Sequence, residues 1–223
     1  MESGCLSGTA LALPLRMLLA CLLACSDYEL GVPSATVSEP PEEDTPPLHA
    51  RADDSADEPD LADCDAGYYA DYFNLPADHP EVELDEGDRT GDVPANHDWW
   101  DPAYFAFRQV DPGLEFGEEW WPVNTGLPGD PQYFAVHWVA TLDVVEDVVV
   151  AFELGSDDDG WAYIDGTIAG ALPGVHAVEA TTFVTALTAG RHQLDLYMAE
   201  RHTSGSGFWF RWNSDAVGIH ACP

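Results

Sequence analysis

The sequence contains no lysine. Seven arginines supply all of its basic charge against 41 aspartates and glutamates, which gives a formal net charge of −34 over 223 residues. Such a field repels nucleic acids and anionic lipid surfaces and attracts divalent cations. We therefore expect cations, and no nucleic acid, among the partners. Life in high salt or a GC-rich genome would also produce this composition, so the cause of the acidity stays open.

Several catalytic signatures are missing too. The chain has no G-x-S-x-G elbow, no P-loop, no H-E-x-x-H and no Cys/His nucleophile arrangement. Carboxylate pairs can drive glycoside hydrolysis, but carboxylates are so abundant here that their presence discriminates nothing. The length suits one well-buried domain with tails. We expect a single binding domain and not an enzyme.

No apolar run is long enough to span a bilayer as a helix. The longest candidate, MLLACLLAC (17–25), follows Arg16 and has the length of the core of an export signal. Its end, Leu-Leu-Ala-Cys, resembles a bacterial lipobox, in which the cysteine is diacylated after cleavage. We expect a signal peptide over residues 1–24, a lipid anchor on Cys25, and a position at the bacterial cell envelope or surface. Secretion after ordinary cleavage is the alternative.

The segment after the signal has almost no aromatic residues. Tyr28 is the only one before Cys64, and Pro, Asp, Glu and Ser dominate, so we expect residues 25–63 to form a disordered acidic tether. Cys64 and Cys222 flank everything that looks foldable, residues 64–223. In an exported protein they are expected to form a disulfide, whose loop of about 160 residues is worth roughly 5 kcal/mol at most. Two free thiols near frayed ends are the alternative.

Between these cysteines the hydrophobic pattern has mostly a period of two. In QYFAVHWVATL (132–142) five apolar residues from Phe134 to Leu142 share one face, as in a strand. Further strands are expected at 148–154, 181–187, 191–200 and 207–213, and a first strand carries Tyr68, Tyr69 and Tyr72. No convincing amphipathic helix appears. The class is all-β, either a two-sheet sandwich or a closed barrel, and the period does not choose between them.

Four ordered motifs resemble those of the PA14 domain, a β-sandwich or barrel-like module. They are GYYADYF (67–73), FAVHWVATL (134–142), VVVAFELGSDDDGWAYIDG (148–166) and LDLYMAERHTSGSGFWFRW (194–212). Within them, DDDGWAYIDG, PGVH (173–176) and AERHTSGSGF (199–208) resemble the fibro-slime branch. One departure is Asp165 where that branch usually has Asn, and we expect Asp165-Gly166 to form a hairpin turn. The resemblance implies a PA14-like fold from residue 64 to about 220.

The resemblance also implies a metal site. In glycan-binding PA14 domains two adjacent aspartates, joined by a cis peptide, chelate a calcium ion that also binds sugar hydroxyls. Asp157 and Asp158 match that pair, and Asp159 adjoins it. Neighbouring carboxylates repel one another, and Ca²⁺ with its six to eight oxygen ligands would compensate. The spacing does not fit an EF-hand; a solvated acidic hairpin without metal is the alternative.

Other polar residues of these motifs are candidates for the same site. Glu200 is a possible metal ligand or an ion-pair partner of an arginine, and His176 and His202 either contact ligand or bond a carboxylate or carbonyl. Trp161 either borders a ligand or packs over the loop. The full set of expected ligand-binding residues is Trp161, His176, Glu200, Arg201, His202 and Ser204. Zinc is not expected, because the chain lacks the paired histidines or cysteines that zinc sites use.

Two tryptophan pairs, Trp99-Trp100 and Trp120-Trp121, lie in Pro- and Gly-punctuated regions. Adjacent strand residues face opposite ways, so we expect one of each pair in the core and only the other as a platform for sugar rings. Together these features predict a calcium-dependent, lectin- or adhesin-like module that binds glycans or surface polysaccharide. A structural or protein–protein adhesion module without a sugar ligand is the alternative function.

Overall fold

The computed structural model describes residues 60–84, 93–123 and 129–222. The predicted signal peptide, the anchor Cys25 and nearly all of the predicted tether lie outside these residues. A 3-10 helix, η1 (Leu61–Asp63), covers the last residues of the tether, and the Asp60 carboxylate caps it by accepting a hydrogen bond from the Ala62 amide at 3.0 Å. This helix lies just before Cys64, the predicted start of the folded domain.

The described residues are mainly strands. In chain order the strands are β1 (Asp65–Ala66), β2 (Tyr68–Asn74), β3 (Phe105–Asp111), β4 (Glu115–Phe116), β5 (Phe134–Val144), β6 (Val148–Asp157), β7 (Asp159–Ile164), β8 (Thr167–Leu172), β9 (Glu179–Leu187), β10 (Gly190–Glu200), β11 (Gly207–Trp212) and β12 (Val217–Ala221). The helices within this part are η1, η2 (Pro94–Asn96) and η3 (Pro102–Tyr104). None of these described helices has the length and apolar character needed to cross a lipid bilayer.

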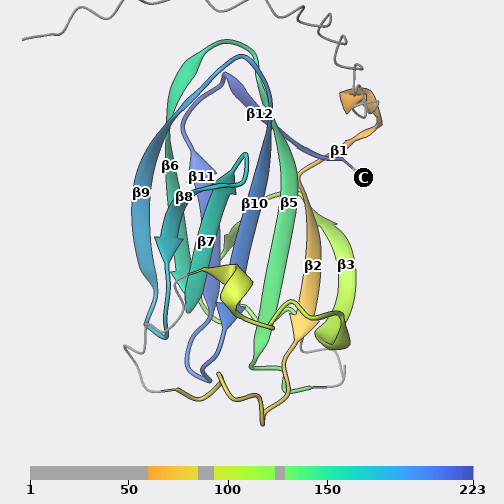
Figure 1. The fold of residues 1–223 in the computed structure, drawn as a ribbon, viewed down its shortest axis with the longest axis vertical. Helices are drawn as coiled ribbons and strands as arrows, with labels where there is room; N and C mark the ends of the chain where they lie inside the picture. The colour runs from red at the N-terminus through yellow and green to blue at the C-terminus, as the bar shows by residue number, and fades with distance from the viewer. Residues whose placement is uncertain (1–59, 85–92, 124–128, 223) are drawn as a thin grey trace, which may run out of the picture. The chain divides into compact units, whose positions relative to one another are not determined.

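The strands form a two-sheet sandwich (Figure 1). An eight-stranded sheet has the order β1-β12-β5-β10-β7-β8, with β2 paired to both β5 and β3, and a four-stranded sheet has the order β4-β11-β6-β9. Apolar side chains from both sheets share one core; for example, the Trp138 ring stacks on Phe208 with 4.5 Å between centroids. The all-β prediction is confirmed, and of the two predicted architectures the structure is the sandwich.

The alternation of apolar and polar residues along β5 and β10 explains how these two strands face the core. The five apolar residues predicted to share a face of β5 are each at most 3% exposed. On the neighbouring β10 the alternating residues Leu194, Leu196 and Met198 are buried in the same core, and Leu196 lies opposite Trp138 in the antiparallel register. One face of each strand thus enters the core, and the other face remains for the outer surface.

The Asp165-Gly166 turn joins β7 to β8, as the sequence predicts. Both residues have positive φ, 51° and 71°, which the turn requires and which Gly166 adopts at no steric cost. At the other end of the sheet order, β1 pairs with β12, with Asp65 opposite Ala221. The predicted disulfide between Cys64 and Cys222 closes this edge, with their Cα atoms 4.6 Å apart.

A second apolar cluster lies on the outer face of the eight-stranded sheet. Trp99 and Trp161 are fully buried in it, and residues 93–104 cover part of this face (yellow to green in Figure 1). Trp100 is half-buried, so the first tryptophan pair has one core member as predicted. The second pair does not follow that rule: Trp120 and Trp121 are both half-buried and both pack against Phe134. The stretch that holds them is irregular, and strand alternation does not apply there.

Candidate metal centre and ligand cavity

The three consecutive aspartates lie where the chain passes from one sheet to the other. β6 of the four-stranded sheet ends at Asp157, and β7 of the eight-stranded sheet begins at Asp159. The register places Ala199 on β10 opposite Asp159, and Gly207 on β11 opposite Asp157. The loop between β10 and β11 therefore meets the aspartates at the same end of the sandwich, as the sequence predicts.

Two of the three aspartates form a carboxylate cluster with Glu200. Asp157, Asp158 and Glu200 each offer one oxygen, and these oxygens all lie within 4.8 Å of one another. All three residues are buried, at 7%, 1% and 0% exposure. The peptide bond between Asp157 and Asp158 is cis, as the resemblance implies. We call these three residues the carboxylate cluster.

Backbone amides hold Asp158 in place within the carboxylate cluster. Its Oδ1 accepts a hydrogen bond from the His176 amide at 2.9 Å, and its Oδ2 accepts one from the Arg201 amide at 3.0 Å. Glu200 is held at one oxygen: its Oε1 accepts from the His202 amide at 3.0 Å, while its Oε2 is buried without a hydrogen-bond partner in the described part of the chain. That oxygen is available to a ligand that the protein itself does not supply.

The structure places Asp159, the third predicted metal ligand, outside the carboxylate cluster. Its carboxylate forms an ion pair with Arg201 Nε at 2.7 Å, both side chains being fully buried, and it also accepts a short hydrogen bond from the Gly174 amide. Asp159 is the first residue of β7, where successive side chains point to opposite faces. It therefore points away from its neighbours toward an arginine that neutralises it, and Glu200 takes the third position in the cluster.

The electrostatics of the carboxylate cluster are unfavourable without a cation. Burial, followed by repulsion from Asp158, raises the pKa of Asp157 to about 6. Burial, again followed by Asp158, raises the pKa of Glu200 well above its usual value. Burial also raises the pKa of Asp159, but there the Arg201 charge opposes the shift. The donor set is thus three hard oxygen ligands with excess negative charge, which fits Ca²⁺.

A cavity of about 110 Å³ opens beside Asp157 and Asp158, and three residues predicted for ligand binding line it: His176, His202 and Ser204. The His176 ring is held by the carbonyls of Ala177 and Leu172, at 2.9 and 3.3 Å, so it also stabilises the loop. His202 Nδ1 lies 3.0 Å from Ser204 Oγ. These residues come from two loops far apart in sequence, and the cavity brings them together.

Two other predicted ligand-binding residues lie beneath the cavity and not in it. Trp161 has no exposed surface and packs on Trp99, with 6.2 Å between ring centroids. Arg201 is equally buried; besides pairing with Asp159, its guanidinium lies 4.9 Å from the Trp99 ring centroid and donates to the Glu81 carbonyl at 3.2 Å. Both support the site from below, and neither presents a surface to a ligand.

Sequence reasoning missed one requirement of the site, at Gly205. This residue has a φ of +85°, and a Cβ added there would lie 2.8 Å from Asp157 Oδ2. Only glycine combines that backbone conformation with so close an approach. The Gly-Ser-Gly stretch of the second loop carried this signal in the sequence.

A second group of metal-ligand residue types, also unpredicted, comprises His79, Glu81 and Asp98. Both nitrogens of the His79 ring are already engaged: Nδ1 accepts from the Glu81 amide at 3.2 Å, and Nε2 lies 3.0 Å from Asp98 Oδ1. With Nδ1 acting as acceptor, the neutral ring carries its proton on Nε2 and donates it to Asp98. These hydrogen bonds account for the group as part of the loop structure.

Comparison with known proteins gives no match to any family model and no match to a curated protein. Among solved structures, the PA14 domain of the antifreeze protein MpAFP superposes with a TM-score of 0.54 at 12% identity, over 74% of this chain and 94% of that chain. A PA14 sugar-binding domain from an RTX adhesin gives 0.50 at 14% identity, over 70% and 97%. An anti-sigma factor domain-containing protein from Clostridium clariflavum gives 0.48 at 17% identity over 71% of this chain, which spans only 45% of that protein. The described domain has a PA14-like fold.

Proposed function

We propose that the domain is a calcium-dependent carbohydrate-binding module. The observation that carries this proposal is the carboxylate cluster. Its three buried carboxylates lie at the ends of β6 and β10 and at Asp158 just after β6, and one oxygen of Glu200 has no hydrogen-bond partner among the described residues. Asp157, Asp158 and Glu200 would hold the ion. When bound, Ca²⁺ supplies further coordination positions that hydroxyl oxygens of a sugar can occupy.

The surrounding residues have separate roles in this proposal. Asp158 is fixed by two backbone amides, so its oxygens are positioned before any ligand arrives. His202 and Ser204 at the cavity wall can exchange hydrogen bonds with sugar hydroxyls beside the ion. The cavity of about 110 Å³ is too small to enclose a whole sugar. The ligand would therefore place one edge of a ring, or a chain end, against the site.

The fold comparison supports this proposal at a coarser level. One of the structures with the same fold is described as a sugar-binding domain from an adhesin. We extend that function to this chain because of the carboxylate cluster and the cavity, and propose binding and not catalysis. Assignment to the fibro-slime branch rests on the sequence motifs alone and stays a prediction.

We further propose that Cys25 carries a lipid anchor and that the acidic segment after it tethers the domain at a bacterial cell surface. The support is the lipobox-like sequence and the composition of residues 26–63. Replacing Cys25 with Ala should move the protein from the membrane fraction to the soluble fraction. Unchanged membrane retention would rule the anchor out.

The function is tested with a glycan array probed in the presence of calcium and again with EDTA. The proposal predicts a defined set of bound glycans that EDTA removes, and loss of the same set in Asp157→Asn and in Glu200→Gln. The control is Asp165→Asn, at the exposed turn between β7 and β8, which should bind as the wild type does. Calcium binding without any EDTA-sensitive glycan would favour the alternative, a structural or protein–protein adhesion module.

A further inference from the structure

A second site lies on the outer face of the eight-stranded sheet. Two rows of cross-strand neighbours build it: Asp71 on β2, His137 on β5 and Tyr197 on β10 lie opposite one another, and so do Tyr69, Val139, Asp195 and Tyr163 of β7. Their neighbours in each strand are core residues, so these side chains all project to the outside. We call these two rows, with Arg108 of β3, the outer-face site.

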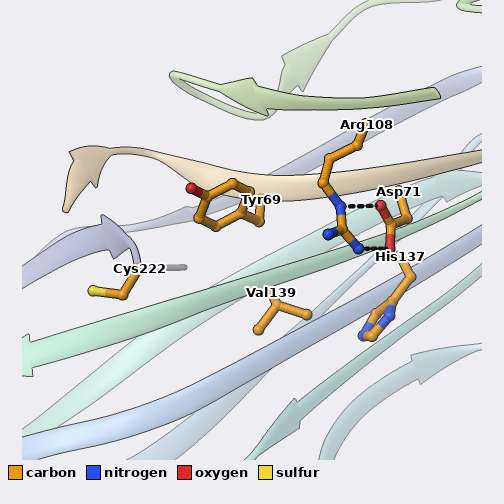
Figure 2. Close-up of a pocket in the computed structure, with 6 residues that line it drawn as sticks. All are labelled: Tyr69, Asp71, Arg108, His137, Val139 and Cys222. Carbon is orange, nitrogen blue, oxygen red and sulfur yellow. Dashed lines mark hydrogen bonds and ion pairs between the residues drawn. The ribbon is translucent and has the colours of Figure 1, made fainter. Parts of the chain in front are cut away.

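The outer-face site is hollowed at two places. One hollow of about 440 Å³ is lined by Tyr69, Asp71, Arg108, His137, Val139 and Cys222 (Figure 2). A second hollow of about 350 Å³ includes Tyr163, Asp195 and Tyr197. His137 of the first hollow lies 2.9 Å from Asp195 of the second, which joins the two. Each volume falls in the usual range for ligand sites, and with strands about 4.8 Å apart the two hollows together extend across roughly 14 Å of sheet; we call the two hollows the groove.

The polar groups of the outer-face site are organised by one ion pair and by hydrogen bonds. Arg108 donates from Nε and Nη2 to the two oxygens of Asp71, both at 2.6 Å, as the dashed lines in Figure 2 show. Asp195 Oδ1 lies 2.9 Å from His137 Nε2, and Asp195 Oδ2 accepts a hydrogen bond from the Gln193 side-chain amide at 2.7 Å. Each carboxylate is thus oriented by a partner and keeps lone pairs for hydroxyl donors, and Arg108 Nη1 remains a donor.

The aromatic groups of the site are also fixed. The His137 and Tyr197 rings stack in parallel, with 4.2 Å between centroids and 5° between planes. Tyr69, Tyr163 and Tyr197 are half-buried, so each presents part of a ring to the hollows. Sugars suit such a surface, because their C–H faces pack on the negative face of an aromatic ring while their hydroxyls reach the polar groups beside it. Tyrosine supplies this contact at low cost in side-chain entropy.

Charge decides the class of ligand. Arg108 neutralises Asp71, while the Asp195 carboxylate is in hydrogen-bonding contact with His137 and Gln193. The chain as a whole carries −34 and repels polyanions such as nucleic acids or acidic polysaccharides. A neutral, hydroxyl-rich chain avoids this repulsion, and its hydroxyl groups can donate hydrogen bonds to the carboxylates of the site.

We propose that the outer-face site binds a neutral polysaccharide, independently of calcium. None of its residues belongs to the carboxylate cluster or lines the cavity beside it. The protein then has two separate contacts with carbohydrate: a small cavity that takes a ring edge or chain end through the ion, and a groove that takes an extended stretch of chain. This inference does not depend on calcium binding at the cluster.

The test is affinity electrophoresis of the full-length protein in native gels that contain dextran, galactomannan or laminarin, with EDTA throughout. At least one of these neutral polysaccharides should retard the wild type. Tyr69→Ala and Arg108→Ala should each weaken the association about tenfold, as expected for truncated aromatic and arginine anchors. Tyr69→Phe, which keeps the ring, should bind within about threefold of the wild type.

Asp157→Asn separates the two sites, because it should abolish EDTA-sensitive glycan binding and leave this retardation unchanged. Arg108→Ala shows whether a loss of binding is caused by misfolding. That side chain is 62% exposed, so its loss should leave the melting temperature nearly unaltered. The proposal is overturned if no neutral polysaccharide retards the protein. Retardation that persists in both Tyr69→Ala and Arg108→Ala overturns it as well.

Discussion

The carboxylate cluster and the outer-face site are built from similar residue types and differ in how their charges are compensated. On the outer face Asp71 and Asp195 are partly exposed; Asp71 forms an ion pair with Arg108, and Asp195 is in hydrogen-bonding contact with His137 and Gln193. In the cluster Asp157, Asp158 and Glu200 are buried, and no cationic side chain is within the group. Burying charge without a partner is costly, so the first region is complete as it stands, and the second calls for an ion.

The same contrast exists between two adjacent residues. Asp159 is as buried as Asp158, yet it has Arg201 at 2.7 Å, whereas the hydrogen bonds that Asp158 accepts come from the backbone amides of His176 and Arg201. The buried negative charge in this run of three aspartates is therefore compensated in two ways: by an arginine at Asp159, and, in our proposal, by a bound cation at Asp157 and Asp158. The following predictions test that reading, in order of decreasing effect.

Removing Arg201 should have the largest effect. Arg201→Met leaves Asp159 buried without its counter-charge, and breaking a buried pair in this way destabilises a protein by about 3–5 kcal/mol. Chemical denaturation measures the loss. Asp159→Asn combined with Arg201→Met should recover much of it, because no charge is then left unpaired. A loss below about 1 kcal/mol for Arg201→Met would show that the pair is not needed to neutralise Asp159.

Calcium should stabilise the wild type by about 2.7 kcal/mol at a hundredfold excess over its dissociation constant. Asp157→Asn and Glu200→Gln remove ligand charge from the cluster and should abolish most of this shift in thermal melts. Asp159→Asn is the informative comparison, because its carboxylate faces Arg201 and not the cluster. A variant of Asp159 that retains the calcium shift would confirm that only two of the three aspartates bind the ion.

Acidity should change the calcium effect in a defined direction. The pKa of Asp157 is raised to about 6 by burial and by Asp158, so between pH 4 and pH 6 the folded protein binds more protons than the unfolded chain. Without calcium, this carboxyl group therefore makes stability fall as the pH rises through that window. Calcium should offset the fall above pH 6 and have little effect at pH 4, where the ligand is protonated.

Melting temperatures from pH 4 to pH 7, with calcium and with EDTA, test this pH dependence. The general repulsion among the acidic residues also weakens the fold as pH rises, so Asp157→Asn serves as the control. The variant should show a shallower slope in EDTA and no added calcium effect. Equal slopes for the two proteins would contradict the assignment of the raised pKa to Asp157.

Breaking the exposed pair should have the smallest effect on stability. Arg108→Met removes the partner of Asp71, but Arg108 is 62% exposed, and surface ion pairs are worth about 0–1 kcal/mol. Denaturation midpoints should differ little from the wild type, whereas the association with a neutral polysaccharide should weaken about tenfold. The comparison with Arg201→Met is direct, because both substitutions remove an arginine from one aspartate.

Much of the fold could be predicted because period-two alternation reports directly on a sheet with one face in the core. β5 and β10 were found in this way. Alternation does not reveal β7, which is predicted only as the strand before the Asp165-Gly166 turn. Nearly every residue of DGWAYI is buried, because the segment that carries Trp99 covers the outer side of this strand. The same cover explains why Trp161 is a core residue and not a ligand contact.

The site could be predicted in part. Asp157, Asp158 and the loop that contains His202 and Ser204 were found from motifs and their order. The sequence could not predict that Asp159 pairs with an arginine while Glu200 joins the carboxylate cluster. This arrangement depends on the direction of the Arg201 side chain, and Arg201 is 42 residues from Asp159. The outer-face site was missed because its residues alternate with the core of several strands, and only the register brings them side by side.

The central claim is that the carboxylate cluster holds calcium, and calorimetric titration of Ca²⁺ into the purified protein tests it most directly. The account predicts a saturable heat in the wild type that is absent from Asp157→Asn, while any weak heat from the many other acidic residues is the same in both proteins. If the wild type gives no saturable heat at millimolar calcium, or if Asp157→Asn gives the same heat as the wild type, the cluster is not a calcium site.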